Sequence, residues 1–157
     1  MCHRRLKRNL RNRRCLRCSD LRIRLLTCSP NIETLIATAM LTTTSGAKPS
    51  VLYNRLMQKE ERVLEIVGRL ETQHGSILEH NRITWYVEAD EGEILRLLLR
   101  NRYFTVTRLG ARSWLMSSNL RAVLEYVSEW DDFGIDLVDS IKEVAPTIFK
   151  LARKGKS

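Results

Sequence analysis

The order of apolar and polar positions divides the chain into two strand-like segments and several helical ones. Residues 21–28 and 82–89 combine alternation with β-branched, aromatic or other apolar side chains, which predicts strands. Residues 42–50 are rich in Thr, Ser, Gly and Pro and form a predicted loop, whereas residues 103–117 fit neither period. Helical spacing of apolar positions extends over about 30–41, 50–73, 91–102, 118–129 and 134–152. The predicted fold is therefore α+β, a helix-rich domain with a small sheet.

Local signals refine the predicted helices. Ser29 is expected to cap the first helix, with Pro30 in its first turn. Pro146 is expected to bend or break the last helix. The longest helix has one apolar face, which consists of Leu52, Leu56, Val63, Ile66, Val67 and Leu70.

Length and composition set the broad class. A chain of 157 residues suits one domain with a sizeable core, and the apolar (43%) and charged (29%) fractions are ordinary for a soluble globular protein. No apolar run approaches the roughly 18–20 residues that span a bilayer. The basic N-terminal segment is not followed by the apolar stretch of a secretory signal. The sequence therefore predicts a cytoplasmic protein that does not bind a membrane.

Positive charge is concentrated at the N-terminal end of the chain. Residues 1–24 hold ten Lys/Arg against one acid, Asp20, whereas residues 25–157 hold 17 basic and 17 acidic residues. We therefore divide the chain into a basic arm, residues 1–20, and a single domain, residues 21–157. Such a block usually binds nucleic acid or an anionic surface, and arginine suits phosphate contacts and stacking on bases. The predicted RNA-binding residues are Arg4, Arg5, Lys7, Arg8, Arg11, Arg13, Arg14 and Arg17.

Two small clusters have some features of metal sites. Cys15 and Cys18 form a C-x-x-C, half of a zinc site, but no second pair follows at regular spacing, and free thiols are the alternative. In the segment HGSILEH, His74 and His80 flank Glu79. The histidines are six residues apart, and a glycine interrupts any helix that could present both on one face. We therefore predict no metal there. The alternative to a metal site is that these three residues are polar residues of the surface.

An ordered set of motifs resembles the flavin-dependent thymidylate synthases. HGSILEH matches the family's H-x-S/T-x-x-E-H segment, and the aromatic-rich strand ITWYVEA follows it. The segment RNRYFTVTRLGAR then lines up with the family signature R-H-R-x-x-S-x-x-x-x-S-x-R. Residues 119–127 resemble the family's N-x-R helix, and RIRLLTCSPNIETLIATAM resembles its first strand and helix. The resemblance covers about residues 21–152 and excludes the basic arm.

The resemblance implies a homotetrameric fold in which these segments bind FAD and deoxyuridine monophosphate. Fixed guanidinium groups suit such anionic ligands, and the flavin performs the difficult chemistry. The residues that the resemblance places at a relic cofactor site are His74, Ser76, Glu79, Arg100 and Arg102. Those that it places at a relic nucleotide site are Thr105, Arg112 and Arg121.

Several departures from the family pattern predict that catalysis is lost. Asn101 stands where the signature has its histidine, and an amide does not titrate near neutral pH. Gly110 replaces the second signature serine. Trp130, followed by two carboxylates, falls near the position of the arginine that activates the pyrimidine. The long family segment before the N-x-R helix is also missing, since Arg112 and Asn119 are only seven residues apart.

A second basic run lies in the otherwise neutral domain. It is either a solvated, salt-bridged face or a phosphate-binding surface, and it consists of Arg96, Arg100, Arg102, Arg108 and Arg112. Leu95, Leu98 and Leu99 lie among these arginines and are expected to pack in the core. Aromatic side chains nearby could stack on bases but are more often core residues; they are Trp85, Tyr86, Tyr103 and Phe104.

These observations predict a non-catalytic RNA-binding protein on a fold like that of the flavin-dependent thymidylate synthases. The expected partners are structured RNA, above all ribosomal RNA, and ribosomal proteins, with contacts mostly to phosphates and no cofactor. The alternative is a minimal enzyme that uses FAD to modify a nucleotide. DNA binding by the arm is a third hypothesis, and a homo-oligomer stays open.

Overall fold

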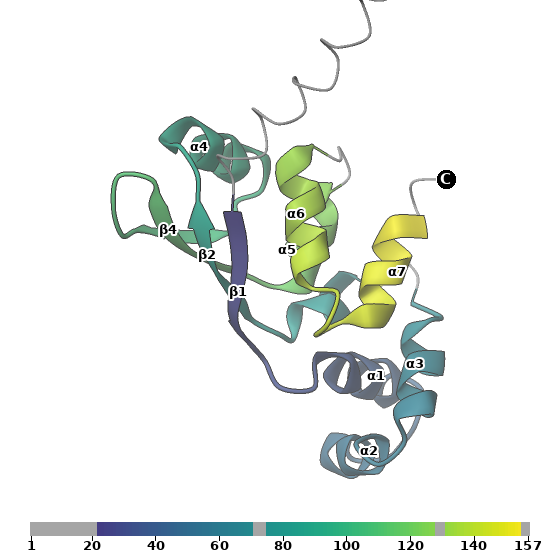
Figure 1. The fold of residues 1–157 in the computed structure, drawn as a ribbon. Coiled ribbons are helices and arrows are strands. Elements are labelled where there is room, and N and C mark those ends of the chain that lie inside the picture. The colour runs from purple at the N-terminus through teal and green to yellow at the C-terminus, as the bar shows by residue number, and fades with distance from the viewer. Residues whose placement is uncertain (1–21, 71–74, 128–130, 155–157) are drawn as a thin grey trace, which may run out of the picture.

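The computed structural model describes residues 22–70, 75–127 and 131–154. Within these ranges the fold is α+β, with seven α-helices and a four-stranded antiparallel open sheet, as Figure 1 shows. The strands are β1 (Arg22–Cys28), β2 (Ile83–Glu88), β3 (Thr105–Arg108) and β4 (Ser113–Ser118). The helices are α1 (Ile32–Thr42), α2 (Pro49–Leu56), α3 (Glu60–Val67), the 3₁₀-helix η1 (Gly75–Glu79), α4 (Glu91–Arg100), α5 (Leu120–Tyr126), α6 (Asp132–Ser140) and α7 (Pro146–Lys154). The predicted α+β class is confirmed.

The sheet has the strand order β1–β2–β4–β3, and each neighbouring pair is antiparallel. Both predicted strands are confirmed, as β1 and β2. The segment 103–117, which fits neither period, contains β3 and most of β4, joined as a hairpin. Most residues of β3 are exposed, so this edge strand has no apolar stripe that a sequence pattern could reveal. In β1, a register shift between Leu25 and Thr27 breaks the alternation.

One face of the sheet is covered by helices. Trp85 and Met116, which are paired on β2 and β4, are completely buried there. The indole Nε1 of Trp85 donates a hydrogen bond to Oγ of Ser140 in α6 at 2.8 Å. On the same face, Arg108 of β3 forms an ion pair with Glu91 of α4 at 3.4 Å. We call this side the covered face.

The opposite side of the sheet is here called the open face. Along β2 and β4, its residues alternate with the buried ones and are only half-buried. Its neighbours on β1 and β3 include exposed residues. The open face carries Arg24, Thr84, Tyr86, Glu88, Thr105, Thr107, Ser113, Leu115 and Ser117.

Three helix predictions are corrected by the structure. The predicted helix 50–73 is two helices, because Lys59 leaves helical geometry (φ −138°, ψ 68°) and α3 starts after it. Ser29 does not cap α1; its Oγ accepts a hydrogen bond from the backbone N of Arg82 at 2.8 Å. Asn31 holds the cap position with a φ of 51°, a left-handed conformation that asparagine tolerates. Pro30 does not lie in the first turn of α1, which begins at Ile32. The predicted break near Pro146 is confirmed: α6 ends at Ser140 and α7 begins at Pro146, whose fixed φ suits a first turn.

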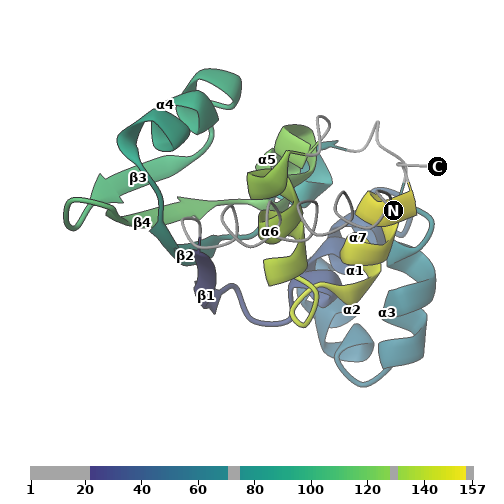
Figure 2. The same ribbon diagram turned by 45° about the horizontal axis from the view of Figure 1, so that its top comes forward.

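Helices α1, α2, α3 and α7 gather at one end of the molecule, away from α4 and the β3–β4 hairpin (Figures 1 and 2). The buried carboxylate of Glu33 connects α1 to α7. It accepts hydrogen bonds from the backbone N of Thr147 at 2.6 Å and of Ile148 at 3.1 Å, and from the Thr147 hydroxyl at 2.9 Å. These donors belong to the first turn of α7, where N–H groups lack helical partners and the helix dipole favours an anion. The contact therefore holds the C-terminal helix on α1.

The leucine stripe of α4 is not core, which corrects the prediction. The helix buries Ile94 and Leu97 against the domain. Leu95, Leu98 and Leu99 are instead 55%, 37% and 78% exposed. Helix α4 therefore has apolar residues on two sides, and helical spacing alone did not show which side faces the core.

Candidate functional site

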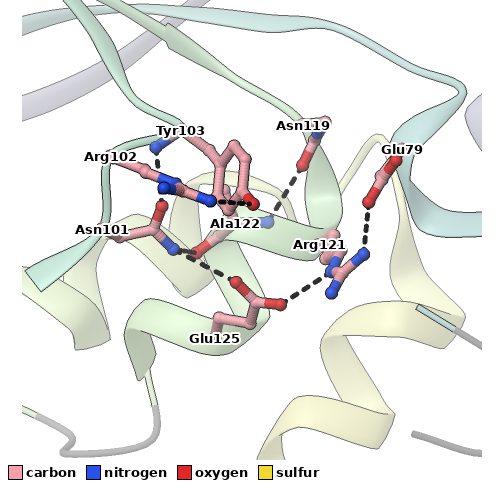
Figure 3. A network of polar contacts seen from close by, with 8 residues as sticks. All are labelled: Glu79, Asn101, Arg102, Tyr103, Asn119, Arg121, Ala122 and Glu125. Carbon is pink, nitrogen blue, oxygen red and sulfur yellow. Dashed lines mark hydrogen bonds and ion pairs between the residues drawn. The ribbon is translucent and has the colours of Figure 1, made fainter. Parts of the chain in front are cut away.

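Much of the predicted site lies outside the described residues. This applies to the whole basic arm, to Cys15 and Cys18, and to His74 and Trp130. The other residues that the resemblance singles out are described. They lie on η1, at the end of α4, in the β3–β4 hairpin and on α5, and Figure 3 shows where several of them meet.

Two asparagine side chains fix the start of α5. Asn119 caps the helix and accepts a hydrogen bond from the backbone N of Ala122 at 3.0 Å. The buried Asn81 accepts from the backbone N of Leu120 at 2.9 Å and donates to the carbonyl of Leu78 in η1 at 2.7 Å. Such bonds satisfy N–H groups that the helix leaves unpaired. They also hold η1 against α5, which brings the predicted site residues of these two elements together.

Arg121 of α5 lies between Glu79 and Glu125 in the cluster of Figure 3. Its guanidinium forms an ion pair with Glu79 of η1, and its Nε donates to Oε1 of Glu125 at 2.7 Å. Hydrogen bonds to Glu125 and Glu79 raise the pKa of the Arg121 guanidinium. Gly75 lies close to this group, and a Cβ there would be 3.2 Å from Cζ of Arg121. The arginine is thus neutralised by two carboxylates of its own chain.

Asn101 joins the end of α4 to the same cluster. The side chain is buried, and its Oδ1 accepts a hydrogen bond from the backbone N of Tyr103 at 2.9 Å. Its Nδ2 donates to the carbonyl of Ala122 at 3.3 Å and approaches Oε2 of Glu125 at 3.5 Å. The amide needs both a donor and an acceptor end for these contacts. Asn101 therefore connects two helices, and its amide does not titrate near neutral pH.

Arg102 and Tyr103 form the exposed rim of the cluster. The Arg102 guanidinium lies 5.3 Å from the centre of the Tyr103 ring, and its NH2 atom donates to the Tyr103 hydroxyl at 3.4 Å. This hydrogen bond raises the pKa of Arg102. Tyr103 is 50% exposed, so the pair lies on the surface.

Arg100 lies at the end of α4 and contacts the start of α6. Its NH1 atom donates to Oδ2 of Asp131 at 2.6 Å, and its guanidinium lies 5.6 Å from the centre of the Tyr126 ring. The Tyr126 hydroxyl donates to the same carboxylate oxygen at 3.0 Å. Burial and the charge of Asp131 raise the pKa of Tyr126 to about 12. Asp131 also caps α6 through the backbone N of Gly134 at 2.7 Å, so Arg100 serves a structural contact.

Thr105 is one of two neighbouring hydroxyl residues at the edge of the open face. It lies opposite Ser117 of β4, and NH2 of Arg82 donates to both hydroxyls, at 2.9 Å to Thr105 and 2.7 Å to Ser117. The backbone N and O of Arg82 also bond Ser29. Arg82 is exposed, so its guanidinium is held in place while it stays accessible.

The structure does not bring all the predicted nucleotide-site residues together. Arg112 and Gly110 lie in the turn that precedes β4, whereas Arg121 follows β4 on α5. A strand of six residues such as β4 spans about 20 Å, so the length of a strand separates the two arginines within one chain. Ser76 is exposed on η1.

Sequence reasoning missed three residues that organise this region. Asn81 reaches a helix start 39 residues later, and no local pattern reveals such a contact. Arg82 likewise bonds residues 23 and 35 positions away. Glu125 was accessible to prediction, because it lies four residues after Arg121, a spacing that favours ion pairs on a helix.

In the ranges that the structure describes, no group of three or more His, Cys, Asp or Glu side chains could hold a metal ion. No helix within the same ranges is long and apolar enough to cross a membrane. Comparisons with protein-family models and with curated proteins found no match.

Proposed function

We propose that this protein is a non-catalytic RNA-binding protein whose partner is structured RNA, above all ribosomal RNA in the ribosome. The proposal includes a finer fold assignment, a shortened relative of the flavin-dependent thymidylate synthases, which rests on the order of motifs along the chain. The observation that carries the function is the separation of charge. Residues 1–24 hold ten Lys/Arg against one acid, while the rest of the chain holds 17 of each.

Such a charge distribution favours a polyanion as the partner. Each phosphate that a Lys or Arg neutralises releases counterions, and this term supplies nearly all of non-specific nucleic-acid affinity. Arginine is preferred over lysine in the arm, and its planar guanidinium can both bind phosphate and stack on unpaired bases. Structured RNA offers both kinds of contact.

The open face supports a continuation of this basic surface onto the domain. β1 carries Arg24, which is exposed and lies 5.6 Å from the centre of the Tyr86 ring. Arg82 presents a second guanidinium on the same face, fixed by the hydroxyls of Thr105 and Ser117. The face has one carboxylate beside them, Glu88, which accepts from the Tyr86 hydroxyl at 3.2 Å. Guanidinium and hydroxyl groups suit phosphate oxygens and the ribose 2′-OH.

The state of the predicted cofactor residues supports binding without catalysis. Arg121 faces Glu79 and Glu125, and Arg100 faces Asp131. These carboxylates would repel a flavin diphosphate or a nucleotide phosphate. Such a ligand could bind the arginines only by displacing the carboxylates. Asn101 is used for buried hydrogen bonds and does not titrate.

The proposal is tested by sedimentation with ribosomes from native cells. The full-length protein should migrate with ribosomes at low salt and leave them at high salt. In filter binding to ribosomal RNA, the slope of log affinity against log salt should fall by about 0.7–0.9 for each phosphate contact removed. The arm variant for both assays combines Arg11→Gln, Arg13→Gln, Arg14→Gln and Arg17→Gln.

A matched variant controls for the loss of positive charge as such. It removes four charges from α2, α3 and their flanks, far from the open face: Arg55→Gln, Lys59→Gln, Arg62→Gln and Arg69→Gln. We expect the arm variant to lose the ribosomes and the control to keep them. If the wild-type protein stays at the top of the gradient at low salt, the ribosome is not its partner. A purified protein with flavin absorbance contradicts the non-catalytic part, and stronger competition by duplex DNA than by ribosomal RNA contradicts RNA as the partner.

A further inference from the structure

Two arginines lie at different ends of the open face along β2. Arg82 directly precedes β2, and its NH2 atom donates hydrogen bonds to the hydroxyls of Thr105 and Ser117. Arg24 lies opposite Tyr86, four residues further along the chain than Arg82. Because a strand rises by about 3.3–3.4 Å per residue, the backbone positions of Arg82 and Tyr86 are about 13 Å apart. A ligand that contacts both arginines must therefore be extended and run along β2.

Arg24 and Tyr86 form a flat platform at one end of this face. The Arg24 guanidinium lies over the Tyr86 ring, with Cζ 5.6 Å from the ring centre. The Tyr86 hydroxyl bonds Ser113 at 3.0 Å and Glu88 at 3.2 Å, so the ring is held in place. Arg24 is exposed, whereas Tyr86 is half-buried. Guanidinium planes stack on bases as well as on aromatic rings, so the outer side of this guanidinium suits the flat face of an unpaired base.

Glu88 makes the two ends of the face chemically different. Its half-buried carboxylate lies beside the Tyr86 hydroxyl and would repel a phosphate at this end. At the other end, the guanidinium of Arg82 and two hydroxyls suit a phosphate. A carboxylate accepts a hydrogen bond from the amino group of cytosine but repels the oxygen that uracil has in its place. The face therefore suits a phosphate at Arg82 and an amino-bearing base beside Glu88.

We propose that the open face binds unpaired nucleotides of an RNA strand, with a phosphate at Arg82 and a base stacked on Arg24 beside Glu88. The inference rests on the proposed RNA binding and narrows its target to single-stranded segments. In a duplex the bases cover one another's flat faces, so a platform of this kind cannot stack on them, whereas phosphate contacts of the arm do not require unpaired bases. The residues at the base end, Arg24, Tyr86 and Glu88, are not among those that the resemblance assigns to a cofactor or a nucleotide.

The first test compares single-stranded and duplex RNA as ligands of the full chain. Fluorescence anisotropy at low salt measures a labelled oligocytidylate of about eight nucleotides and a labelled blunt duplex of mixed sequence. Arg24→Lys keeps the positive charge but removes the planar guanidinium. It should weaken binding of the single strand about fivefold and leave binding of the duplex within about twofold. Arg55→Lys on α2 changes another exposed arginine in the same way and should leave both affinities unchanged.

The outcomes separate this inference from the proposed function. If wild type binds ribosomal RNA but Arg24→Lys weakens the single strand no more than the duplex, the inference is overturned and the proposed function stands. If wild type binds no RNA at low salt, both are overturned. Circular dichroism of the variant excludes unfolding as the cause of a loss.

The second test concerns the base beside Glu88. Wild type should bind oligocytidylate more tightly than oligouridylate, by about threefold or more. Glu88→Gln introduces an amide, which can donate a hydrogen bond to the uracil oxygen and still accept one from the Tyr86 hydroxyl. This variant should lose the preference for cytosine, whereas Glu61→Gln on α3, at another exposed carboxylate, should keep it. A wild type without the preference, or a preference that Glu88→Gln leaves unchanged, overturns this arrangement of the bound strand.

Discussion

Neighbouring residues of β2 face two environments with different physical demands. Trp85 and Val87 are completely buried under the helices, whereas Thr84 and Tyr86 are half-buried on the open face. On the covered face, removal of apolar area from water supplies most of the stabilisation. On the open face, polar side chains bond to one another at the surface, where such contacts add little to stability. The comparison implies that substitutions one residue apart should separate folding from binding.

The largest effect is expected from Trp85→Ala. The substitution removes the biggest completely buried side chain and leaves a cavity between the sheet and α6, so it should lower the free energy of unfolding by about 3–5 kcal/mol. Thr84→Ala, one position earlier on the open face, should change it by less than about 1 kcal/mol. Urea unfolding followed by circular dichroism measures both. Equal losses in the two variants would mean that the open face is also packed against something.

A smaller loss of stability is expected from Ser140→Ala. The variant removes the oxygen that accepts from Nε1 of Trp85 at 2.8 Å and leaves a buried indole N–H unpaired. Such a group costs about 1–2 kcal/mol in the free energy of unfolding. Ser113→Ala is the control, since Ser113 bonds the Tyr86 hydroxyl on the open side of the sheet at 3.0 Å. An unchanged unfolding midpoint for Ser140→Ala would show that water replaces the serine.

On the open face the expected effect is on binding. Arg82→Ala should weaken binding to ribosomal RNA about fivefold, or about 1 kcal/mol, and reduce its salt dependence. Arg55→Ala on α2 removes an exposed arginine outside this face and should leave the affinity within twofold, or about 0.4 kcal/mol. Filter binding at several salt concentrations measures both variants. If the two variants bind alike, the arm alone contacts the RNA and the open face does not.

The elements of the fold were largely predictable, because their signals are local. Alternation marked β2, and helical spacing of apolar positions marked α4, whose start at Glu91 agrees with the prediction. The errors lie where tertiary contacts decide. Lys59 breaks a helix whose apolar face continues on both sides of the break, and the helical period could not show that Leu99 faces solvent.

The candidate site was less predictable, for the same physical reason. The sequence singled out Glu79 and Arg121, and the structure pairs them, but their contact spans 42 residues and depends on Asn81, which no motif indicated. Ion pairs also change the role that an arginine of the motif can have. A guanidinium that reads as a phosphate ligand in a motif is here neutralised by carboxylates, which only the folded chain reveals.

The smallest expected effect lies at the margin of the covered layer, at Tyr126. Its ring packs edge-to-face against Phe104 and Phe133, and its hydroxyl bonds Asp131. Burial and the Asp131 carboxylate raise its pKa to about 12, compared with about 10 in an unfolded chain. The folded protein therefore holds this proton more tightly. The resulting stabilisation is complete below about pH 10 and is lost as the pH rises toward 12. Since the Asp131 carboxylate that the hydroxyl bonds is 38% exposed, solvent screening reduces it to about 0.5 kcal/mol.

Tyr126→Phe isolates this contribution, because phenylalanine keeps the ring contacts and cannot ionise. Wild type should be more stable than the variant at pH 9, and the difference in the free energy of unfolding should shrink between pH 10 and 12. Urea titrations of both proteins across this range measure the difference. The contributions of all other titrating groups are common to both proteins and cancel. A difference that stays constant with pH would mean that the hydroxyl is solvated and that the covered layer ends at the rings of Phe104 and Phe133.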